Sequence, residues 1–184
     1  MPEPKPAAGG PLRLYVDESK SRGLLLAVAC VNAHDLTTTR SQMRSLLLPD
    51  QRRIHFTHEK DGRRRSILTE LQQMGITAFI VSAPKSSGPI PGRERCLREV
   101  AAFAAQLRVV TITVERDDSV VSLDRRVLYS ALHRQRPDII YRHERAYDEP
   151  LLWAADALAW SWAKGGAWRE LVRPMLRRSV ELGP

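Results

Sequence analysis

Two apolar runs near the start of the chain constrain its fold most strongly. Leu12 to Val16 has the length and composition of a buried strand, and Gly23 to Val31 supplies a second apolar run of strand length. Only a short polar stretch separates the two runs, which predicts an antiparallel hairpin. The first run ends at the acidic pair Asp17-Glu18, so we expect these carboxylates at the edge of a sheet.

Helices and strands are expected to alternate along the rest of the chain. Helical spacing and flanking breakers predict helices over residues 37–48, 61–74, 93–107, 120–134, 150–163 and 168–176. Further strands are expected over 76–81, 109–114 and 138–141, with a brief extended piece over 53–56 and a loop, a candidate mobile flap, over 84–92. This order predicts an α/β fold in which helices cover the faces of a mixed sheet. Residues 1–11 are rich in proline and poor in apolar side chains, so we expect a disordered tail followed by a single domain over 12–184.

Composition narrows the expected location and partners. The chain has no run of roughly 18 uncharged apolar residues and no secretory-signal layout at its N-terminus, which favours a soluble cytoplasmic protein without a membrane partner. Cys30 and Cys96 are not spaced as in disulfide frameworks or zinc sites, so free thiols are expected. The net charge of +8, carried mainly by arginine, favours a polyanionic partner, although a solvated basic surface would have the same composition.

Three carboxylates stand where the hydrophobic pattern disfavours them. Asp17 and Glu115 each directly follow a predicted strand, and Asp156 is the only charged residue in the predicted helix over 150–163. If the two strands are parallel neighbours, Asp17 and Glu115 emerge at one edge of the sheet, where Asp156 can join them. Close carboxylates raise one another's pKa unless a divalent cation neutralises them, and oxygen ligands suit Mg²⁺ or Mn²⁺. The pattern therefore predicts a metal site formed by Asp17, Glu115 and Asp156.

Four segments resemble, in order, the motifs of the domain-of-unknown-function family 3800. Residues 14–19 (LYVDES) resemble its YVDES strand motif, and residues 54–59 (IHFTHE) look like its HF segment before an arginine-rich helix. Residues 114–115 fall at its central strand end, and residues 151–159 (LLWAADALA) resemble its C-terminal LQLADLIAG helix. The resemblance covers most of residues 12 to 165. The chain departs from the pattern at Lys20, where glycine usually follows, and at Trp153, where glutamine is common.

The resemblance implies both a fold and an activity. The family is similar to ribonuclease-H-like proteins, which implies a mixed sheet with helices on its faces, an N-terminal hairpin and acidic residues clustered over the central strands. It further implies a metal-dependent nuclease site in which Asp17 and Asp156 match the acidic motif positions. Glu18 and Glu115 are their expected catalytic companions, and Glu59 is a weaker candidate.

Basic residues near these motifs are candidate nucleic-acid contacts. Clusters at the start of the helix over 61–74 and after the strand over 138–141 are expected to bind phosphates: Arg63, Arg64, Arg65, Arg142 and Arg145. A solvated helical turn is the alternative for the first cluster.

Histidine and tryptophan side chains permit two readings each. His55 and His58 could serve as ligands or proton-transfer groups, but in an extended segment they point to opposite faces, so at most one is expected at the site. Tryptophans in the last third of the chain could stack on bases. The two-turn spacing of Trp153 and Trp160 instead favours packing, in the core or at the interface of a homodimer.

Two functions follow from these observations. The leading hypothesis is a Mg²⁺- or Mn²⁺-dependent phosphodiesterase, a nuclease acting on RNA or DNA. The alternative is a non-catalytic nucleic-acid- or protein-binding module with a ribonuclease-H-like fold. It predicts scattered acids and an Asp156 paired with an arginine such as Arg142 or Arg169. A third hypothesis is a toxin, an antitoxin or a mobile-element accessory. The sequence alone does not distinguish it from the other two.

Overall fold

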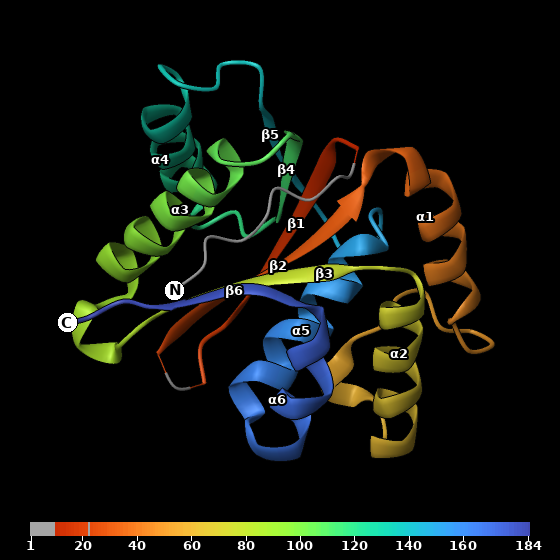
Figure 1. Cartoon of the computed structure of the whole chain (residues 1–184). Coiled ribbons are helices and arrows are strands. Elements are labelled where there is room, and N and C mark those ends of the chain that lie inside the picture. Colours follow the sequence, from red (N-terminus) through yellow and green to blue (C-terminus); the bar gives the residue numbers. More distant parts are fainter. Residues whose placement is uncertain (1–9, 22) are drawn as a thin grey trace.

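One mixed sheet organises the chain in the computed structural model, which describes residues 10–21 and 23–184. Its strands are β1 (Leu12–Ser19), β2 (Leu24–Asn32), β3 (Thr77–Ala83), β4 (Val109–Glu115), β5 (Ile140–Glu144) and β6 (Leu176–Glu181). The order across the sheet is β5-β4-β1-β2-β3-β6 (Figure 1). β2 is antiparallel to β1 and β3, whereas β1-β4, β4-β5 and β3-β6 are parallel pairs. The predicted hairpin is confirmed. The tail predicted over residues 1–11 falls mostly on residues 1–9, which lie outside the described part.

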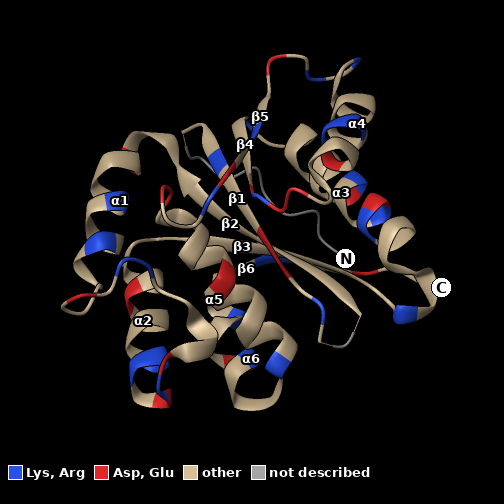
Figure 2. Ribbon diagram, turned by 180° about the vertical axis from the view of Figure 1, so that it is seen from behind, with Lys and Arg blue, Asp and Glu red and all other residues tan. Residues whose placement is uncertain are grey.

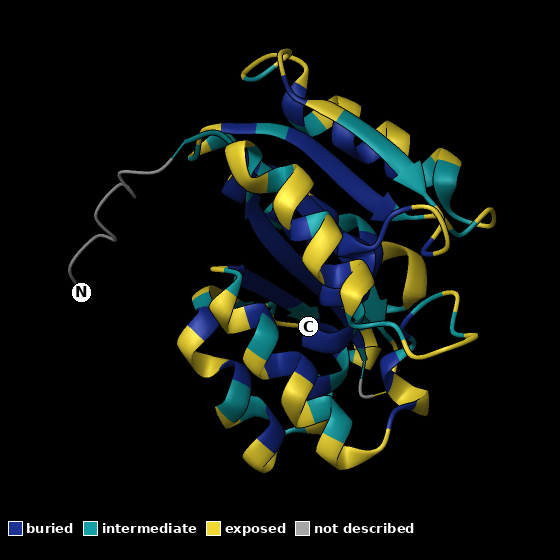
Figure 3. Ribbon diagram, turned by 90° about the vertical axis from the view of Figure 1, so that its right-hand side faces the viewer, coloured by how far each residue is buried: buried dark blue, intermediate teal, exposed yellow. Residues whose placement is uncertain are grey.

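Helices cover both faces of the sheet (Figure 1). One layer contains α1 (Leu36–Ser45), α2 (Asp61–Gln73), α5 (Leu151–Lys164) and α6 (Gly166–Val172), and the other contains α3 (Pro89–Ala105) and α4 (Val121–Leu132). Each layer packs its own apolar core against the sheet. Figure 3 shows the buried strands between helices whose outer faces are exposed. This architecture confirms the α/β expectation.

Side-chain alternation along β1 divides its residues between the two cores. Tyr15 packs into the core that contains α5, whereas Leu14 and Val16 pack into the core that contains α3. Asp17 and Glu18 continue this alternation at the end of the strand. The helix α5 is apolar on nearly every face because it lies buried against β1 and β2.

Three predicted elements differ in the structure. The expected extended piece over 53–56 is instead an irregular segment leading into a 3₁₀ turn, Phe56–His58. The expected flap over 84–92 contains a 3₁₀ turn and the start of α3, because Gly88 has a left-handed φ of 73° and Pro89 begins the helix well. The predicted last helix ends at Val172, before Pro174, and residues 176–181 form β6.

Two expectations from composition can be compared with the structure. Cys30 and Cys96 are buried and free, and burial raises the pKa of their thiols to about 12 and about 11. Both thiols therefore stay protonated near neutral pH. Among the helices of residues 10–21 and 23–184, none combines the length and apolarity required to cross a bilayer.

Candidate active site

Four acidic side chains line one cavity of about 200 Å³ at the end of the central strands. Asp17 and Glu18 come from β1, Glu115 comes from β4, and Asp156 comes from α5. β1 and β4 are parallel neighbours whose paired residues run to Val16 and Val114, so the acids that follow emerge at the same edge. Figure 2 shows the acidic end of β1 beside the acidic band of α5. The structure thus brings together the four acids selected from the sequence.

Asp17 has the most strongly perturbed environment in this cavity. Its side chain is buried, with 8% of the residue exposed. Burial raises the pKa of Asp17 well above its usual range, and the neighbouring carboxylates of Glu115 and Asp156 raise it further. The backbone N–H of Glu18 donates to Asp17 Oδ1 at 2.7 Å, which opposes the rise without cancelling it. The cavity therefore concentrates negative charge that protein cations do not fully balance.

Asp156 is compensated by an adjacent loop and not by an arginine. Its Oδ2 accepts a hydrogen bond from the backbone N–H of Phe56 at 2.9 Å and lies 3.2 Å from His55 Nδ1. Within the described residues neither Arg142 nor Arg169 contacts it; these arginines donate elsewhere. The alternative of an arginine partner for Asp156 is therefore wrong. His55 is the one of the two candidate histidines that lines the cavity.

Glu18 is held from the opposite face of the sheet. Arg93 donates to Glu18 and also forms two hydrogen bonds, of 2.6 and 2.8 Å, to the buried Asp124. His143 Nε2 lies 3.0 Å from Asp124. Burial alone would raise the pKa of Asp124, but hydrogen bonds from Arg93 and His143 outweigh burial and hold it below its usual value. Glu18 also pairs with Lys20 at 2.6 Å, so its charge is balanced by two cations.

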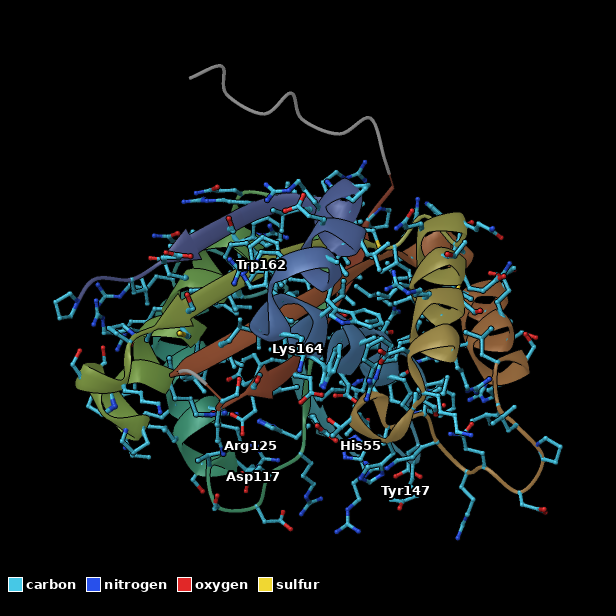
Figure 4. The ribbon with its side chains drawn as sticks, turned by 90° about the horizontal axis from the view of Figure 1, so that it is seen from below. His55, Asp117, Arg125, Tyr147, Trp162 and Lys164 are labelled. Atoms are coloured by element: carbon cyan, nitrogen blue, oxygen red, sulfur yellow. The ribbon has the colours of Figure 1, made fainter. Side chains whose placement is uncertain are left out.

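Arg53 was not predicted from the sequence and also lines this cavity. Its guanidinium is 3.8 Å from Glu115 and stacks 4.8 Å from the ring centre of Tyr147. In Figure 4, which views this end of the sheet, His55 lies between Asp117 and Tyr147. The sequence offered one signal for Arg53, its position directly before the IHF segment. Its contact with Glu115 could not be predicted, because the two residues lie far apart in the sequence.

The predicted phosphate-binding arginines have different environments. Arg63 pairs with the buried Glu59 at 2.6 Å, and Arg64 donates to the carbonyls of Phe56 and Thr57. These contacts give Arg63, Arg64 and Glu59 a structural use in holding the loop before α2. The role of Arg63 and Arg64 as phosphate contacts stays a prediction.

The other three predicted arginines are less committed to internal contacts. Arg65 is exposed and lies over the ring of Trp168, 4.9 Å from its centre, and Arg145 is exposed after β5. Arg142 is half-buried and donates to Thr113 at 3.4 Å. Their contact with nucleic acid also stays a prediction.

The tryptophans pack within the chain. Trp153, Trp162 and Trp168 are buried, whereas Trp160 is half-buried and contacts the edges of Phe56 and Trp168. The packing interpretation of these residues therefore fits the structure. The homodimer stays a prediction.

The donor set of the cavity suits a hard cation in its chemistry. Carboxylate oxygens are the preferred ligands of Mg²⁺ and Mn²⁺. The pKa of Asp17 is raised first by burial and then by the neighbouring carboxylates, whose charge a cation would neutralise. In the part of the chain that is described, however, no group of three His, Cys, Asp or Glu side chains is arranged to hold a metal ion. Asp17, Glu115 and Asp156 line one cavity, but in this structure they are not arranged as the ligands of one metal ion.

Comparisons with known proteins identify the fold. No model of a known protein family matches the chain, and no curated protein matches it. Among solved structures, the chain is similar to one in the PCNA:RNase HII complex from Archaeoglobus fulgidus, with 18% identity and a TM-score of 0.52 over 80% of this chain and 69% of that chain. It is also similar to a mutant of Bst-RNase HIII, with 13% identity and a TM-score of 0.50 over 82% of this chain and 51% of that chain.

The chain spans about half the length of the Bst-RNase HIII chain. At sequence identities of 13% and 18%, the similarity to these structures establishes the fold alone. The chain has a ribonuclease-H-like fold, as the sequence resemblance implied.

Proposed function

We propose that this chain is a divalent-cation-dependent phosphodiesterase that cleaves RNA or DNA. The observation that carries the proposal is the convergence of Asp17, Glu115 and Asp156, from three separate elements, on one cavity. Such side chains repel one another when ionised, and a fold that stabilised only itself would gain by replacing them. Placing them side by side is useful when a cation and a phosphate occupy the cavity.

Different residues of the chain would have different roles in such a site. Asp17, Glu115 and Asp156 would hold Mg²⁺ or Mn²⁺, which activates water and stabilises the leaving oxygen when bound. Arg93 fixes Glu18 at the cavity wall, and His55 keeps Asp156 oriented. Basic residues on the surrounding surface would bind the nucleic-acid backbone.

Two resemblances support this proposal. The fold is similar to structures of RNase HII and RNase HIII, whose names state a ribonuclease activity for those proteins. The motifs of residues 12 to 165 resemble the domain-of-unknown-function family 3800, and through it the ribonuclease-H-like proteins. Both resemblances favour nucleic acid over other phosphodiesters as the substrate.

One observation favours a non-catalytic binding module as the second candidate. Asp156 already accepts hydrogen bonds from Phe56 and His55, and among the described side chains no three potential ligands are arranged for a metal. A module of this kind would bind nucleic acid equally well with and without divalent cations. The two functions are therefore separable by one set of measurements.

Cleavage assays with single-stranded RNA, single-stranded DNA and RNA–DNA hybrids in Mg²⁺, Mn²⁺ or EDTA test the proposal. We expect cation-dependent cleavage that falls by about 100-fold or more in Asp17→Asn, equivalent to about 2.7 kcal/mol of transition-state stabilisation. Asp138→Asn is the matched control, because Asp138 is exposed just before β5, at the other end of the sheet from Glu144. Binding without cleavage of any substrate, unchanged by EDTA, would favour the binding module and contradict the nuclease.

A further inference from the structure

A second, larger cavity adjoins the carboxylates. It has a volume of about 560 Å³ and shares three lining residues with the acidic cavity: Glu18, His55 and Asp156. The two cavities therefore form a continuous depression across the end of β1. We define the larger part, away from Glu115, as the lysine groove.

The walls of the lysine groove carry ammonium and hydroxyl groups. Lys20, Ser19 and Ser21 come from the end of β1 and the turn after it, Lys164 is the last residue of α5, and Thr57 lies in the 3₁₀ turn. Ammonium and hydroxyl groups of side chains commonly contact the phosphate and sugar oxygens of nucleic acids. They come from three elements far apart in the sequence, so the combination is a property of the fold.

Both lysines are available for a ligand. Lys164 is exposed and forms no ion pair within residues 10–21 and 23–184. Lys20 pairs with Glu18, but its side chain is 66% exposed and such surface pairs contribute little. A lysine at the end of α5 also suits the helix dipole. That explanation does not account for Lys20 and the hydroxyl groups on the facing wall.

We propose that the lysine groove binds a phosphate of the nucleic-acid strand next to the one held at the carboxylates, through Lys20 and Lys164. This inference rests on the proposed function, since it assigns the route by which the substrate strand leaves the acidic cavity. The charge order supports it: Asp17 and Glu115 line only the acidic cavity, whereas Lys20 and Lys164 line only the lysine groove.

The groove offers little for reading bases. Its largest aromatic side chain, Trp160, has Arg64 over its ring at 4.2 Å and makes T-shaped contacts with Phe56 and Trp168. Base stacking on Trp160 is therefore restricted, and the remaining groups suit the backbone. The groove thus binds a strand without regard to sequence.

Fluorescence anisotropy of labelled single-stranded oligonucleotides in EDTA tests this binding independently of cleavage. Lys20→Gln and Lys164→Gln should each reduce the slope of log K against log salt by about 0.7, the value for one phosphate contact on a single strand. The double variant should lose about twice as much, equally for mixed and homopolymeric sequences. Arg178→Gln is the control, because Arg178 is an exposed cation on the edge strand β6.

The outcomes separate this inference from the proposed function. Lysine-dependent binding by a protein that cleaves nothing would retain the groove and contradict the nuclease. Cation-dependent cleavage with salt slopes unchanged in both lysine variants would contradict the groove. Displacement of the oligonucleotide by inorganic phosphate at an equal phosphate concentration would show a site for free phosphate, and would also overturn the strand-binding proposal. Unchanged melting temperatures would confirm that the variants fold.

Discussion

At the scale of single residues, neighbours in sequence have opposite electrostatic environments. Asp17 is buried beside two carboxylates, which raise its pKa beyond the effect of burial. Glu18 contacts Arg93 and Lys20, two cations. An uncompensated buried carboxylate lowers the stability of the folded state at neutral pH, so Asp17 is a residue whose presence calls for a function.

Replacing Asp17 with asparagine should stabilise the protein. The carboxamide keeps an oxygen for the Glu18 N–H but removes the charge, and such changes commonly add about 0.5–2 kcal/mol. Because the folded-state pKa of Asp17 is raised, the cost of its buried charge is relieved as the pH falls through that pKa toward the ordinary value of 3.8. The difference between variant and native protein should therefore be largest at neutral pH and shrink on acidification. Urea unfolding at a series of pH values without divalent cations measures it, and a variant less stable than the native protein at pH 7 would contradict the argument.

The acids were predictable from the sequence, but their partners were not. Asp17, Glu115 and Asp156 follow or interrupt apolar runs, so local pattern alone marked them. His55 was one of two candidate histidines, between which the sequence did not choose. Arg93 and Arg53 reach the site from elements far from these acids in the sequence, at positions that no apolar period marks. Long-range side-chain pairing depends on how elements pack, and packing is not encoded in local periodicity.

At the scale of elements, the turn between β1 and β2 positions the lysine groove. Gly23, directly before β2, has a φ of 123°, and an added Cβ would lie 2.6 Å from the carbonyl oxygen of Ala83. Only glycine tolerates both the left-handed backbone and this approach. The turn that carries Lys20 is thereby fixed against the end of β3.

Gly23→Ala should destabilise the hairpin. Strain at such a position costs about 1–3 kcal/mol, because the alanine must either keep an unfavourable φ or displace the Ala83 carbonyl. Urea unfolding followed by circular dichroism measures the loss. Gly62→Ala serves as a control, since a Cβ at Gly62 in α2 meets no atom within 4 Å. Native stability in Gly23→Ala would show that the turn can rearrange freely.

Elements with strong periodicity were predicted well, whereas those defined by their neighbours were not. The hairpin, α2 and β4 match their expected ranges within a few residues because their apolar positions repeat regularly. β6 contains Arg177, Arg178 and Glu181 and pairs only with β3, so as an edge strand it lacks the apolar run of a buried one. Its strand conformation comes from its partner.

At the scale of the whole molecule, the sheet separates two apolar cores. The acidic residues from β1, β4 and α5 meet at one edge of this sheet. The mixed α/β class was predictable from the alternation of elements, and the ribonuclease-H-like fold from the ordered motifs. The strand order, with β1 between β2 and β4, depends on long-range pairing. Because that order places Asp17 beside Glu115, the stability of the whole fold should respond to a cation bound at this edge.

Mg²⁺ or Mn²⁺ should raise the melting temperature of the native protein. A ligand that binds only the folded state at 100 times its dissociation constant adds about 2.7 kcal/mol of stability. Asp17→Asn should start from a higher melting temperature without cations and gain little on their addition, whereas Asp138→Asn should respond as the native protein does. Differential scanning calorimetry with matched ionic strength provides the measurement. Equal gains in all three proteins would place cation binding elsewhere.

The opposite orientations of Asp17 and Glu18 make the phase of β1 a functional property. One inserted residue before Asp17 within the strand would exchange the faces of the two acids. Asp17 would then point toward Arg93 and lose its negative neighbours, while Glu18, which now lines the cavity from the side of Arg93, would take the buried position beside Glu115 and Asp156. In laboratory evolution of this chain, insertions and deletions should therefore accumulate in the turn after Ser19. Within β1 they should occur only in pairs that restore the alternation of the two faces.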